Sequence, residues 1–392
     1  MTTKQHWILP EGIEEILPEQ AARYEAMRRL ILDMYATWGY EQVMPPVIDF
    51  VDSLLTGTGH DLDLQTFKLV DQFSGRTLGL RADMTPQVAR IEAHQLRRDV
   101  PTRLCYMGTV LHTRPENIGD SRSPLQIGAE LYGHAGVESE VEIIGLMLQT
   151  FKDLQIDNVF LDLGNVDIYR GLAKQAKLSD EVESQLFDML QRKAVTEINS
   201  LLASLDLDVE MNKMLSGLAT LNGGQSVFAR ARALLQKADK PVQDAIDYLE
   251  KTAELTRQRF GDIKMHFDLS ELQGYHYKTG VVFAAFVEEL GQAIARGGRY
   301  DDIGEIFGRA RAATGFSTDL KILNQLSKKQ FSTKQKILAP ADEDEKLKAR
   351  IAELRAQGEV VVAQLPGQEA DAKAMGCDKS LSLVDGQWLV QG

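Results

Sequence analysis

The segment ELQGYHYKTG at residues 271–280 concentrates polar and aromatic side chains that could bind a polar ligand. These side chains include an amide, two phenols, an imidazole and an ammonium, from Gln273, Tyr275, His276, Tyr277 and Lys278. The alternation in IKMHFDL at 263–269 and the apolar run VVFAAFV at 281–287 predict strands on either side. We predict that the connection is a hairpin, and because a plain hairpin needs only a few turn residues, we interpret it as the wall of a ligand site. Core packing is the alternative, since tyrosine is common in strands.

Isolated catalytic motifs do not reveal an active site. The sequence contains no Gly-rich P-loop, HExxH or G-x-S-x-G motif, and its seven histidines are scattered. Phosphoribosyl transfer would favour paired acidic residues followed by a Ser/Thr/Gly-rich loop, and none is visible. The two cysteines, Cys105 and Cys377, form no CxxC pair. We therefore predict no metal site, no cofactor and no disulfide framework.

Composition restricts the class of protein. A chain of 392 residues is long enough for two or three domains. Its net charge of −13, its pI near 5.1 and the lack of a basic stripe argue against nucleic acid as a partner. The apolar runs are too short to span a bilayer, and the N-terminus shows no secretory signal. These features predict a cytoplasmic protein that does not enter a membrane.

Hydrophobic periodicity divides the chain into a β-rich core, an inserted helical module and a small C-terminal α/β domain. The predicted bounds are 1–325 for the core, about 170–258 for the module, 326–335 for a linker and 336–392 for the last domain. In the core we expect helices at 19–38, 138–155 and near 316–326, strands at 43–50, 103–113, 125–133 and 158–163, and a hairpin within 67–86 that turns at Ser74-Gly75. In the C-terminal domain we expect strands at 336–341, 359–365 and 379–390, a helix at 343–356 and one short helix.

Four segments in a fixed order resemble histidyl-tRNA synthetases. LRADMTPQVAR at 80–90 is similar to their LRPEGT segment, and residues 103–131 are similar to their motif 2 in length and framing. LQGYHYKTGVVF at 272–283 resembles their RGLDYYNRTVF, and GGRYDD at 297–302 resembles their GGRYDGL. The resemblance covers about residues 6–325. It implies an α+β fold with the class II aminoacyl-tRNA synthetase-like antiparallel sheet core, which dimerises through a motif 1 that PPVIDF matches weakly.

The resemblance also implies a histidine-binding pocket. Asp83 and Thr85 stand where the family holds the histidine ammonium, and Gln126 and Glu130 match the QxxxE that follows motif 2. A carboxylate in a partly desolvated cleft gives an ammonium a charge-assisted hydrogen bond, and Glu130 would take one imidazole nitrogen. The other candidates for the pocket wall are Tyr275, His276, Tyr277, Gly297 and Gly298.

Three departures from the synthetase pattern remove its arginines. His112 stands for the arginine of motif 2, Gln273 for the histidine-specific arginine and Ile322 for the arginine of motif 3. Guanidinium groups stabilise the charge that develops on phosphate during adenylation, so we predict that this chain does not activate ATP. A fourth departure is Lys278, which replaces a tyrosine of the pocket and could repel an imidazolium.

Structural roles are the alternatives for several of these residues. Asp83 and Thr85 could cap a helix. Glu130 could be a solvated strand residue, and Arg299 and Asp301 could form an ion pair. The order of the four segments favours the pocket for Asp83, Thr85, Gln126 and Glu130.

A synthetase-like chain with an amino-acid pocket and without the activating arginines resembles the regulatory subunits of ATP phosphoribosyltransferase. That resemblance implies a non-catalytic partner of a short-form catalytic subunit in the first step of L-histidine biosynthesis. It also implies L-histidine as the feedback ligand, a homodimer through the core and a hetero-octamer with the catalytic subunit. A divergent histidyl-tRNA synthetase is the main alternative, and a tRNA-sensing module and a non-tRNA amino-acid ligase are two others.

Overall fold

The computed structural model describes residues 7–55, 60–115, 120–272, 274–275, 277–368 and 371–392. Two of the predicted positions, Gln273 and His276, lie outside the described residues. The chain divides into two compact units, Met1–Lys329 and Gln330–Gly392, and each unit is described by itself below. No helix in the described part of the chain is both long and apolar enough to cross a membrane.

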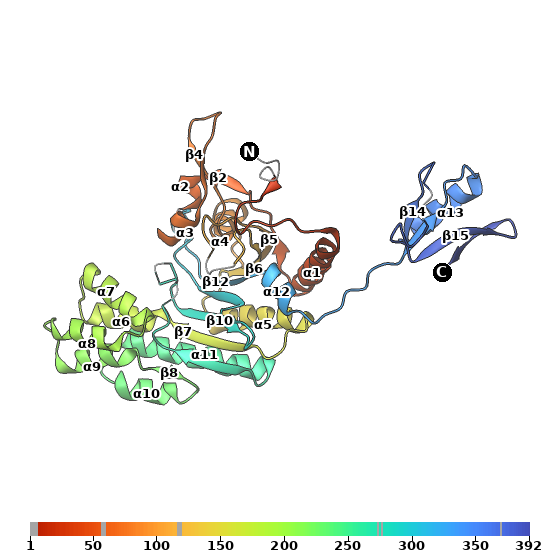
Figure 1. The fold of residues 1–392 in the computed structure, drawn as a ribbon. Coiled ribbons are helices and arrows are strands. Elements are labelled where there is room, and N and C mark those ends of the chain that lie inside the picture. The colour runs from red at the N-terminus through yellow and green to blue at the C-terminus, as the bar shows by residue number, and fades with distance from the viewer. Residues whose placement is uncertain (1–6, 56–59, 116–119, 273, 276, 369–370) are drawn as a thin grey trace. The chain divides into compact units, whose positions relative to one another are not determined.

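A nine-stranded sheet forms the centre of the first unit in the described part of the chain (Figure 1). In spatial order its strands are β1 (Glu41–Gln42), β5 (Thr102–Thr109), β6 (Leu125–Tyr132), β12 (Ala313–Asp319), β11 (Ala295–Arg299), β10 (Val281–Phe286), β7 (Phe160–Asn165), β9 (Lys264–Asp268) and β8 (Asn222–Gly223). The pairs β1–β5 and β7–β9 are parallel, and the other neighbours are antiparallel. This arrangement confirms the predicted α+β class.

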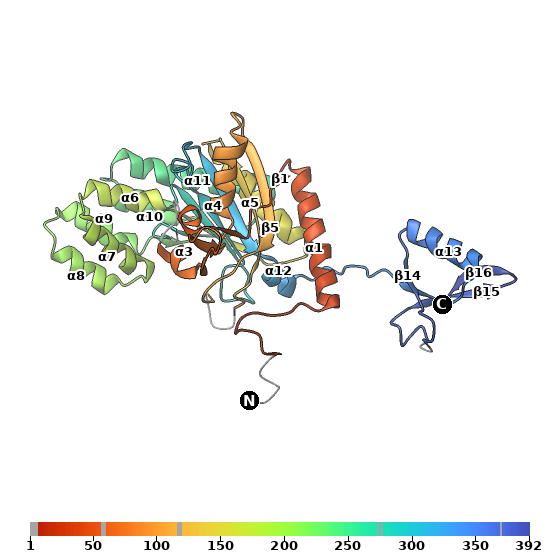
Figure 2. The same cartoon turned by 90° about the horizontal axis from the view of Figure 1, so that it is seen from above.

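Helices α1 (Pro18–Thr37), α5 (Val137–Asp153) and α11 (Lys240–Phe260) pack against the sheet. The buried side of α1 consists of Tyr24, Met27, Ile31 and Tyr35, which recur at helical spacing. The ring of Tyr35 meets Phe316 of β12 edge-on, with 6.3 Å between ring centroids. Seen from above (Figure 2), α1 runs beside β1 and β5. These contacts fix the core strands in place beneath the candidate site.

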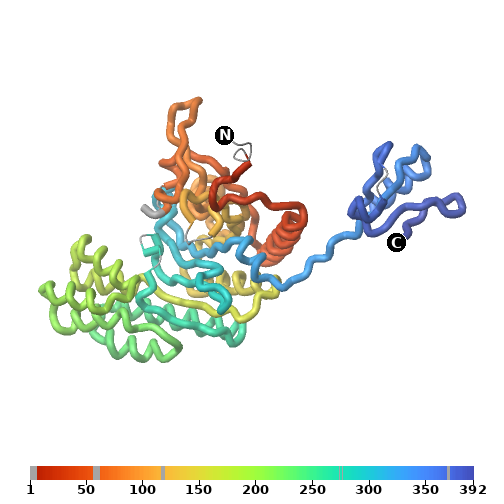
Figure 3. The backbone as a smooth tube through the Cα atoms, viewed as in Figure 1, coloured from red at the N-terminus to blue at the C-terminus, as the bar shows by residue number. Residues whose placement is uncertain are grey.

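The inserted module leaves the sheet after β7 and returns to it at β9, as the green stretch of the backbone trace shows (Figure 3). Its helices are α6 (Val166–Gln175), α7 (Asp180–Gln191), α8 (Val195–Ala203), α9 (Val209–Leu218), α10 (Val227–Leu234) and α11. Apolar residues at helical spacing are buried, such as Leu186 on α7 and Val242, Ile246 and Leu249 on α11. The module also contributes the short strand β8 to the main sheet.

A second, three-stranded sheet covers part of the first unit. Its antiparallel strands are β2 (Ile48–Phe50), β4 (Thr77–Leu80) and β3 (Lys68–Val70). The short helices α2 (Val51–Leu54) and α3 (His60–Gln65) accompany it, and α4 (Thr85–Arg90) continues into the π-helical turn Ile91–Leu96. The predicted hairpin between β3 and β4 is confirmed, with Gly75 at φ +75° in the turn.

Three predictions about the core were wrong. Residues 43–50 do not form one strand, because residues 43–47 lie in no strand and β2 covers only Ile48–Phe50. The connection 271–280 is not the tip of a hairpin, because β9 and β10 lie on opposite sides of β7 and both pair with it. The segment therefore crosses the end of β7. The closing helix does not begin near 316, since residues 313–319 form β12 and α12 (Leu320–Leu326) begins only after Asp319, which caps it through the backbone N–H of Lys321.

The second unit is a four-stranded sheet with one helix among its described residues. Its strands are ordered β14 (Val360–Ala363), β13 (Lys336–Ala339), β15 (Lys379–Val384) and β16 (Gln387–Gln391), and α13 (Glu345–Ala356) packs on the sheet through Leu347 and Leu354. The single strand predicted at 379–390 is wrong, because Asp385 and Gly386 turn the chain into the hairpin β15–β16. The predicted short helix is also wrong, since residues 372–376 form turns.

Candidate functional site

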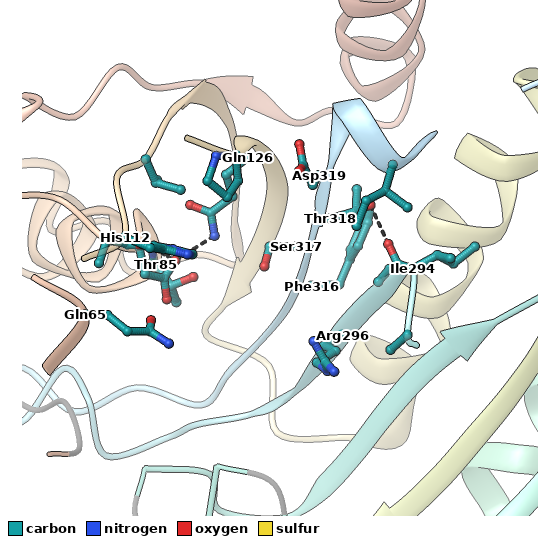
Figure 4. A pocket seen from close by; sticks show the side chains of 18 of the residues that line it. Gln65, Thr85, His112, Gln126, Ile294, Arg296, Phe316, Ser317, Thr318 and Asp319 are labelled. Atoms are coloured by element: carbon teal, nitrogen blue, oxygen red, sulfur yellow. Dashed lines mark hydrogen bonds between the residues drawn. The ribbon is translucent and has the colours of Figure 1, made fainter. Parts of the chain in front are cut away.

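A cavity of about 1140 Å³ lies over strands β6, β12 and β11. The start of α4, the 271–280 connection and α7 supply the surrounding walls. Figure 4 shows Thr85, Gln126, Ser317 and Arg296 around this space. The cavity brings together all the predicted histidine-binding residues that the structure describes, namely Asp83, Thr85, Gln126, Glu130, Tyr275, Tyr277, Gly297 and Gly298.

Glycines clear the floor of the cavity next to Glu130. The sheet register places Glu130 opposite Gly315, and Gly315 opposite Gly298. A Cβ atom on Gly315 would overlap the Glu130 carboxylate. Gly298 has φ +153°, and a Cβ atom there would lie 2.7 Å from the carbonyl oxygen of Val281. These glycines are therefore required by close approach, and they let the carboxylate extend over the sheet.

Glu130 is the buried acid of the cavity, with only 1% of its surface exposed. Its carboxylate accepts hydrogen bonds from the hydroxyls of Tyr106 (2.8 Å), Thr85 (3.1 Å) and Tyr300. Burial raises the pKa of Glu130 to about 8, although these three donors oppose the change. The alternative of a solvated strand residue is wrong. Glu130 is therefore largely protonated near neutral pH.

Asp83 and Gln126 form a second polar wall. Oδ1 of Asp83 accepts hydrogen bonds from Nε2 of Gln126 at 2.7 Å and from the backbone N–H of Thr85 at 3.1 Å. Oε1 of Gln126 accepts the backbone N–H of Met84 at 3.0 Å. Because Thr85 is the first residue of α4, Asp83 supports the helix start and lines the cavity at the same time. A carboxylate has enough lone pairs for both roles.

Lys278 is buried in the wall between the cavity and the sheet. It is 7% exposed, and its Nζ donates a hydrogen bond to the carbonyl oxygen of Gly297 at 2.6 Å. Burial lowers the pKa of Lys278 to about 8. At neutral pH the ammonium is therefore still mostly charged, and it is held against β11.

Tyr275 connects the cavity wall to the inserted module. Its hydroxyl donates a hydrogen bond to Oε1 of Glu183 on α7. Its ring centroid lies 5.4 Å from those of Tyr169 and Phe187. Tyr277 also lines the cavity and is 41% exposed. Tyr275 is thus held by the module, and Tyr277 is the more exposed of the two tyrosines.

The described positions that match ATP-binding arginines carry other groups. Nε2 of His112 lies 2.9 Å from the carbonyl oxygen of Ala82, which directs the imidazole toward the backbone. Ile322 lines the cavity with an apolar side chain. Lys321 beside it forms an ion pair with Glu14, with 2.6 Å between Nζ and Oε1. No group of three or more His, Cys, Asp or Glu side chains in the described ranges is placed to hold a metal ion.

The sequence did not identify Tyr300 and Arg296, which line the cavity, or Tyr106, which binds Glu130. Tyr106 reaches Glu130 because its neighbour in the register is Gly128, and nothing in its own segment signals this contact. Tyr300 and Arg296 flank the GGR stretch, so their proximity to the glycine pair was an available signal. The predicted ion pair of Arg299 and Asp301 is confirmed at 3.1 Å.

Comparisons with known proteins agree with this geometry. The family model for histidyl-tRNA synthetase matches residues 12–323. A solved structure from Bacillus halodurans C, described as an ATP phosphoribosyltransferase regulatory subunit/histidyl-tRNA synthetase, superposes with a TM-score of 0.83 at 27% identity, covering 94% of this chain and 96% of that chain. The histidyl-tRNA synthetase of Nostoc sp. PCC 7120 shares the fold with a TM-score of 0.76 at 17% identity, covering 96% and 91% of the two chains. Fold and site together define a protein with a histidyl-tRNA synthetase-like class II core.

Curated relatives narrow this class. The chain is 58% identical over 383 residues to the ATP phosphoribosyltransferase regulatory subunit of Thioalkalivibrio sulfidiphilus, which covers 97% of both chains. The chain belongs to the family of ATP phosphoribosyltransferase regulatory subunits. The relative from Methylococcus capsulatus, of the same name, is 53% identical over 387 residues, covering 98% of this chain and 95% of that one. Residues 334–391 match the family model for the ATP phosphoribosyltransferase subunit HisZ C-terminal domain.

Proposed function

We propose that the cavity binds L-histidine and that this chain transmits histidine occupancy to a short-form catalytic subunit of ATP phosphoribosyltransferase. The observation that carries the proposal is the buried Glu130, which three hydroxyls surround next to the Asp83–Gln126 wall. A histidine offers an imidazole and an ammonium, and the cavity offers one acid for each. The phosphoribosyl transfer itself belongs to the catalytic subunit.

In the proposed complex the imidazole lies against Glu130 and the ammonium against Asp83. Asp83 accepts hydrogen bonds through Oδ1 from Gln126 and Thr85, so its orientation is set before the ligand arrives. In this pose the carboxyl of Glu130, which is protonated near neutral pH, donates a hydrogen bond to a ring nitrogen of the ligand. Charge-assisted hydrogen bonds of this kind are about twice as strong as neutral ones.

The groups at the former arginine positions support the proposal that this chain does not activate ATP. A triphosphate needs cationic groups at the attacking centre, whereas His112 faces a backbone carbonyl and Ile322 is apolar. Glu14 and Asp319 also line the cavity, and their carboxylates would repel a phosphate placed beside them. Because Lys321 is already paired with Glu14, its charge is largely compensated. The chain is therefore expected to bind histidine without forming an adenylate.

Contacts between the 271–280 connection and the inserted module provide a path by which ligand binding in the cavity can affect the module. Nη2 of Arg170 on α6 donates hydrogen bonds to the carbonyl oxygens of Tyr275 (3.0 Å) and Lys278 (2.8 Å). Nζ of Lys193 binds Asp268 and Ser270 at the start of the connection. A ligand that favours one arrangement of this connection therefore also biases the module.

The assembly also belongs to the proposal. Met44, Val47 and Ile48 in the 43–50 segment are 76%, 51% and 41% exposed in the single chain. Apolar side chains grouped on a surface mark interaction sites, and PPVIDF within this segment weakly resembles the dimerising motif 1. We expect a homodimer through this segment and a hetero-octamer with the catalytic subunit. Val47→Glu should lower the sedimentation coefficient of the free chain to that of a monomer, and an unchanged dimer would place the interface elsewhere.

Calorimetric titration of the free chain with L-histidine tests the binding site. Truncating Asp83 or Glu130 to alanine should weaken binding by about 2–5 kcal/mol, because each leaves a ligand group without its partner. Asp206→Asn, at an exposed position away from the cavity, is the matched control. Unchanged affinity in both cavity variants would place the ligand at another site, whereas adenylate formation would favour a divergent histidyl-tRNA synthetase.

A further inference from the structure

The histidine pose proposed above leaves one ligand group without a partner, the α-carboxylate. Because the carboxylate is negatively charged, its partner should be a cation in the cavity wall. The described lining residues with basic side chains are His112, Lys278, Arg296 and Lys321. The choice among them can be made from their contacts and positions.

All four side chains already have interaction partners, so the choice depends on how many donors each one retains. Lys321 binds Glu14, Ser121 and Ser123 through its single Nζ. Nζ of Lys278 donates to the carbonyl oxygen of Gly297. The imidazole of His112 faces the backbone. A guanidinium differs from these groups because its five N–H donors form a planar fork, so it can keep an existing partner and still hold a carboxylate through two parallel bonds.

The sheet register places Arg296 on the cavity side. Along β11, Arg296 lies two residues from Gly298, so both project from the same face of the sheet. Gly298 is opposite Gly315, and Gly315 is opposite Glu130. Strand spacing puts the Cα atoms of Arg296 and Glu130 about 12 Å apart, two strands across and two residues along. One amino acid between the two side chains fills such a span.

The neighbour of Arg296 across β12 is Ser317, which lines the same cavity. Figure 4 shows Ser317 between Thr85 and Gln126 on one side and Arg296 on the other. A hydroxyl beside a guanidinium provides a further donor for a carboxylate oxygen. On the other side of Ser317 in the register lies Gly128, so no side chain from β6 fills this part of the floor.

We propose that Arg296 binds the carboxylate of the amino-acid ligand and thereby makes the site selective for free α-amino acids. The inference rests on the proposed histidine site and adds its ligand class. The imidazole at Glu130, the ammonium at Asp83 and the carboxylate at Arg296 together hold all three polar groups of the ligand. Amines that carry the same ring without a carboxylate fit only two of these positions.

Calorimetry with L-histidine, L-histidinol and histamine tests the assignment, because the last two lack the carboxylate. Wild type should bind L-histidine about 10- to 100-fold more tightly than either amine, the range expected for hydrogen bonds to charged groups. Arg296→Ala should abolish this preference by weakening histidine binding alone, and Arg296→Lys should restore part of it. Arg232→Ala, an exposed arginine on α10 that pairs with Asp247 and Glu250, is the matched control.

Each outcome decides the question. If Arg296→Ala weakens L-histidine and L-histidinol equally, Arg296 has a structural role and the assignment is wrong. Equal binding of L-histidine and L-histidinol by wild type would also overturn it, while leaving the histidine site intact. Failure of wild type to bind any of the three compounds would instead overturn the proposed function. Thermal unfolding of each variant without ligand shows whether the fold is preserved.

Discussion

Replacing the buried Glu130 by glutamine should change how the stability of the protein depends on pH. Glutamine has the shape of a protonated glutamic acid, and it stays neutral at every pH. In the wild type, burial raises the pKa of this carboxyl from 4.5 to about 8. Ionising Glu130 in the folded protein therefore places a charge in a site that disfavours charge. The Glu130→Gln variant avoids this cost.

The sign follows from where each state holds the proton. The unfolded chain loses it near pH 4.5, whereas the folded chain keeps it until about pH 8. Between these values the folded state binds more protons, so wild-type stability falls as the pH rises. The contribution is fully present below pH 4.5 and is lost through pH 8. The expected slope is about 1.4 kcal/mol per pH unit, and the whole window amounts to at most about 5 kcal/mol.

Urea unfolding of wild type and Glu130→Gln without ligand, from pH 5 to pH 9, measures this difference. The stability of the variant relative to wild type should rise steadily between pH 5 and pH 8 and then level off. Glu210→Gln, at an exposed position on α9, should show no such rise. Parallel stability curves for wild type and Glu130→Gln would refute the argument, because they would mean that Glu130 is already ionised in the folded protein.

Three further predictions concern the cavity and its connection to the module. Purified protein should show no histidine-dependent exchange of pyrophosphate into ATP, since each missing charge-stabilising donor raises the barrier by about 2.7–4 kcal/mol, and exchange at ordinary enzyme concentrations would contradict this. Lys278→Met should bind histidine more tightly at pH 6.5, and the gain should shrink above pH 9, because the wild-type ammonium loses its charge as the pH rises through about 8. An equal gain at both pH values would show that the charge is not responsible. Tyr275→Phe removes the hydrogen-bond donor to Glu183 and should lower the free energy of unfolding, measured with urea, by about 1–2 kcal/mol. An unchanged free energy of unfolding would mean that this hydrogen bond does not hold the connection to the module.

Long periodic segments made the elements predictable, whereas pairing between distant strands did not. The helices of the module follow from apolar spacing over many residues. The connection 271–280 resembled a hairpin because consecutive strands usually pair, yet β7, more than a hundred residues earlier in the chain, lies between β9 and β10. Residues 313–319, ATGFSTD, contain few apolar side chains, so hydrophobic periodicity does not distinguish helix from strand there. The Asp385-Gly386 pair was a readable hairpin signal that the prediction overlooked.

The candidate site was predictable where motif order carried the information. Asp83, Thr85, Gln126 and Glu130 come from segments whose sequence resembles one family, and the structure gathers them in one cavity. The contact of Tyr300 with Glu130 could not be predicted from the sequence, because the two residues are 170 positions apart in the chain. The raised pKa of Glu130 also depends on burial between distant strands, which a single segment does not reveal.

The central claim is that histidine acts on catalysis through this cavity. The most direct test mixes the purified chain with a short-form catalytic subunit and follows phosphoribosyl-ATP formation during a histidine titration. With wild type, the chain should change the turnover and histidine should reduce it, with a coupling of about 1–3 kcal/mol between the two sites. Asp83→Ala and Glu130→Ala should assemble normally and shift the histidine response to at least tenfold higher concentration. An unchanged response in both variants would contradict the account, because histidine would then act at a different site.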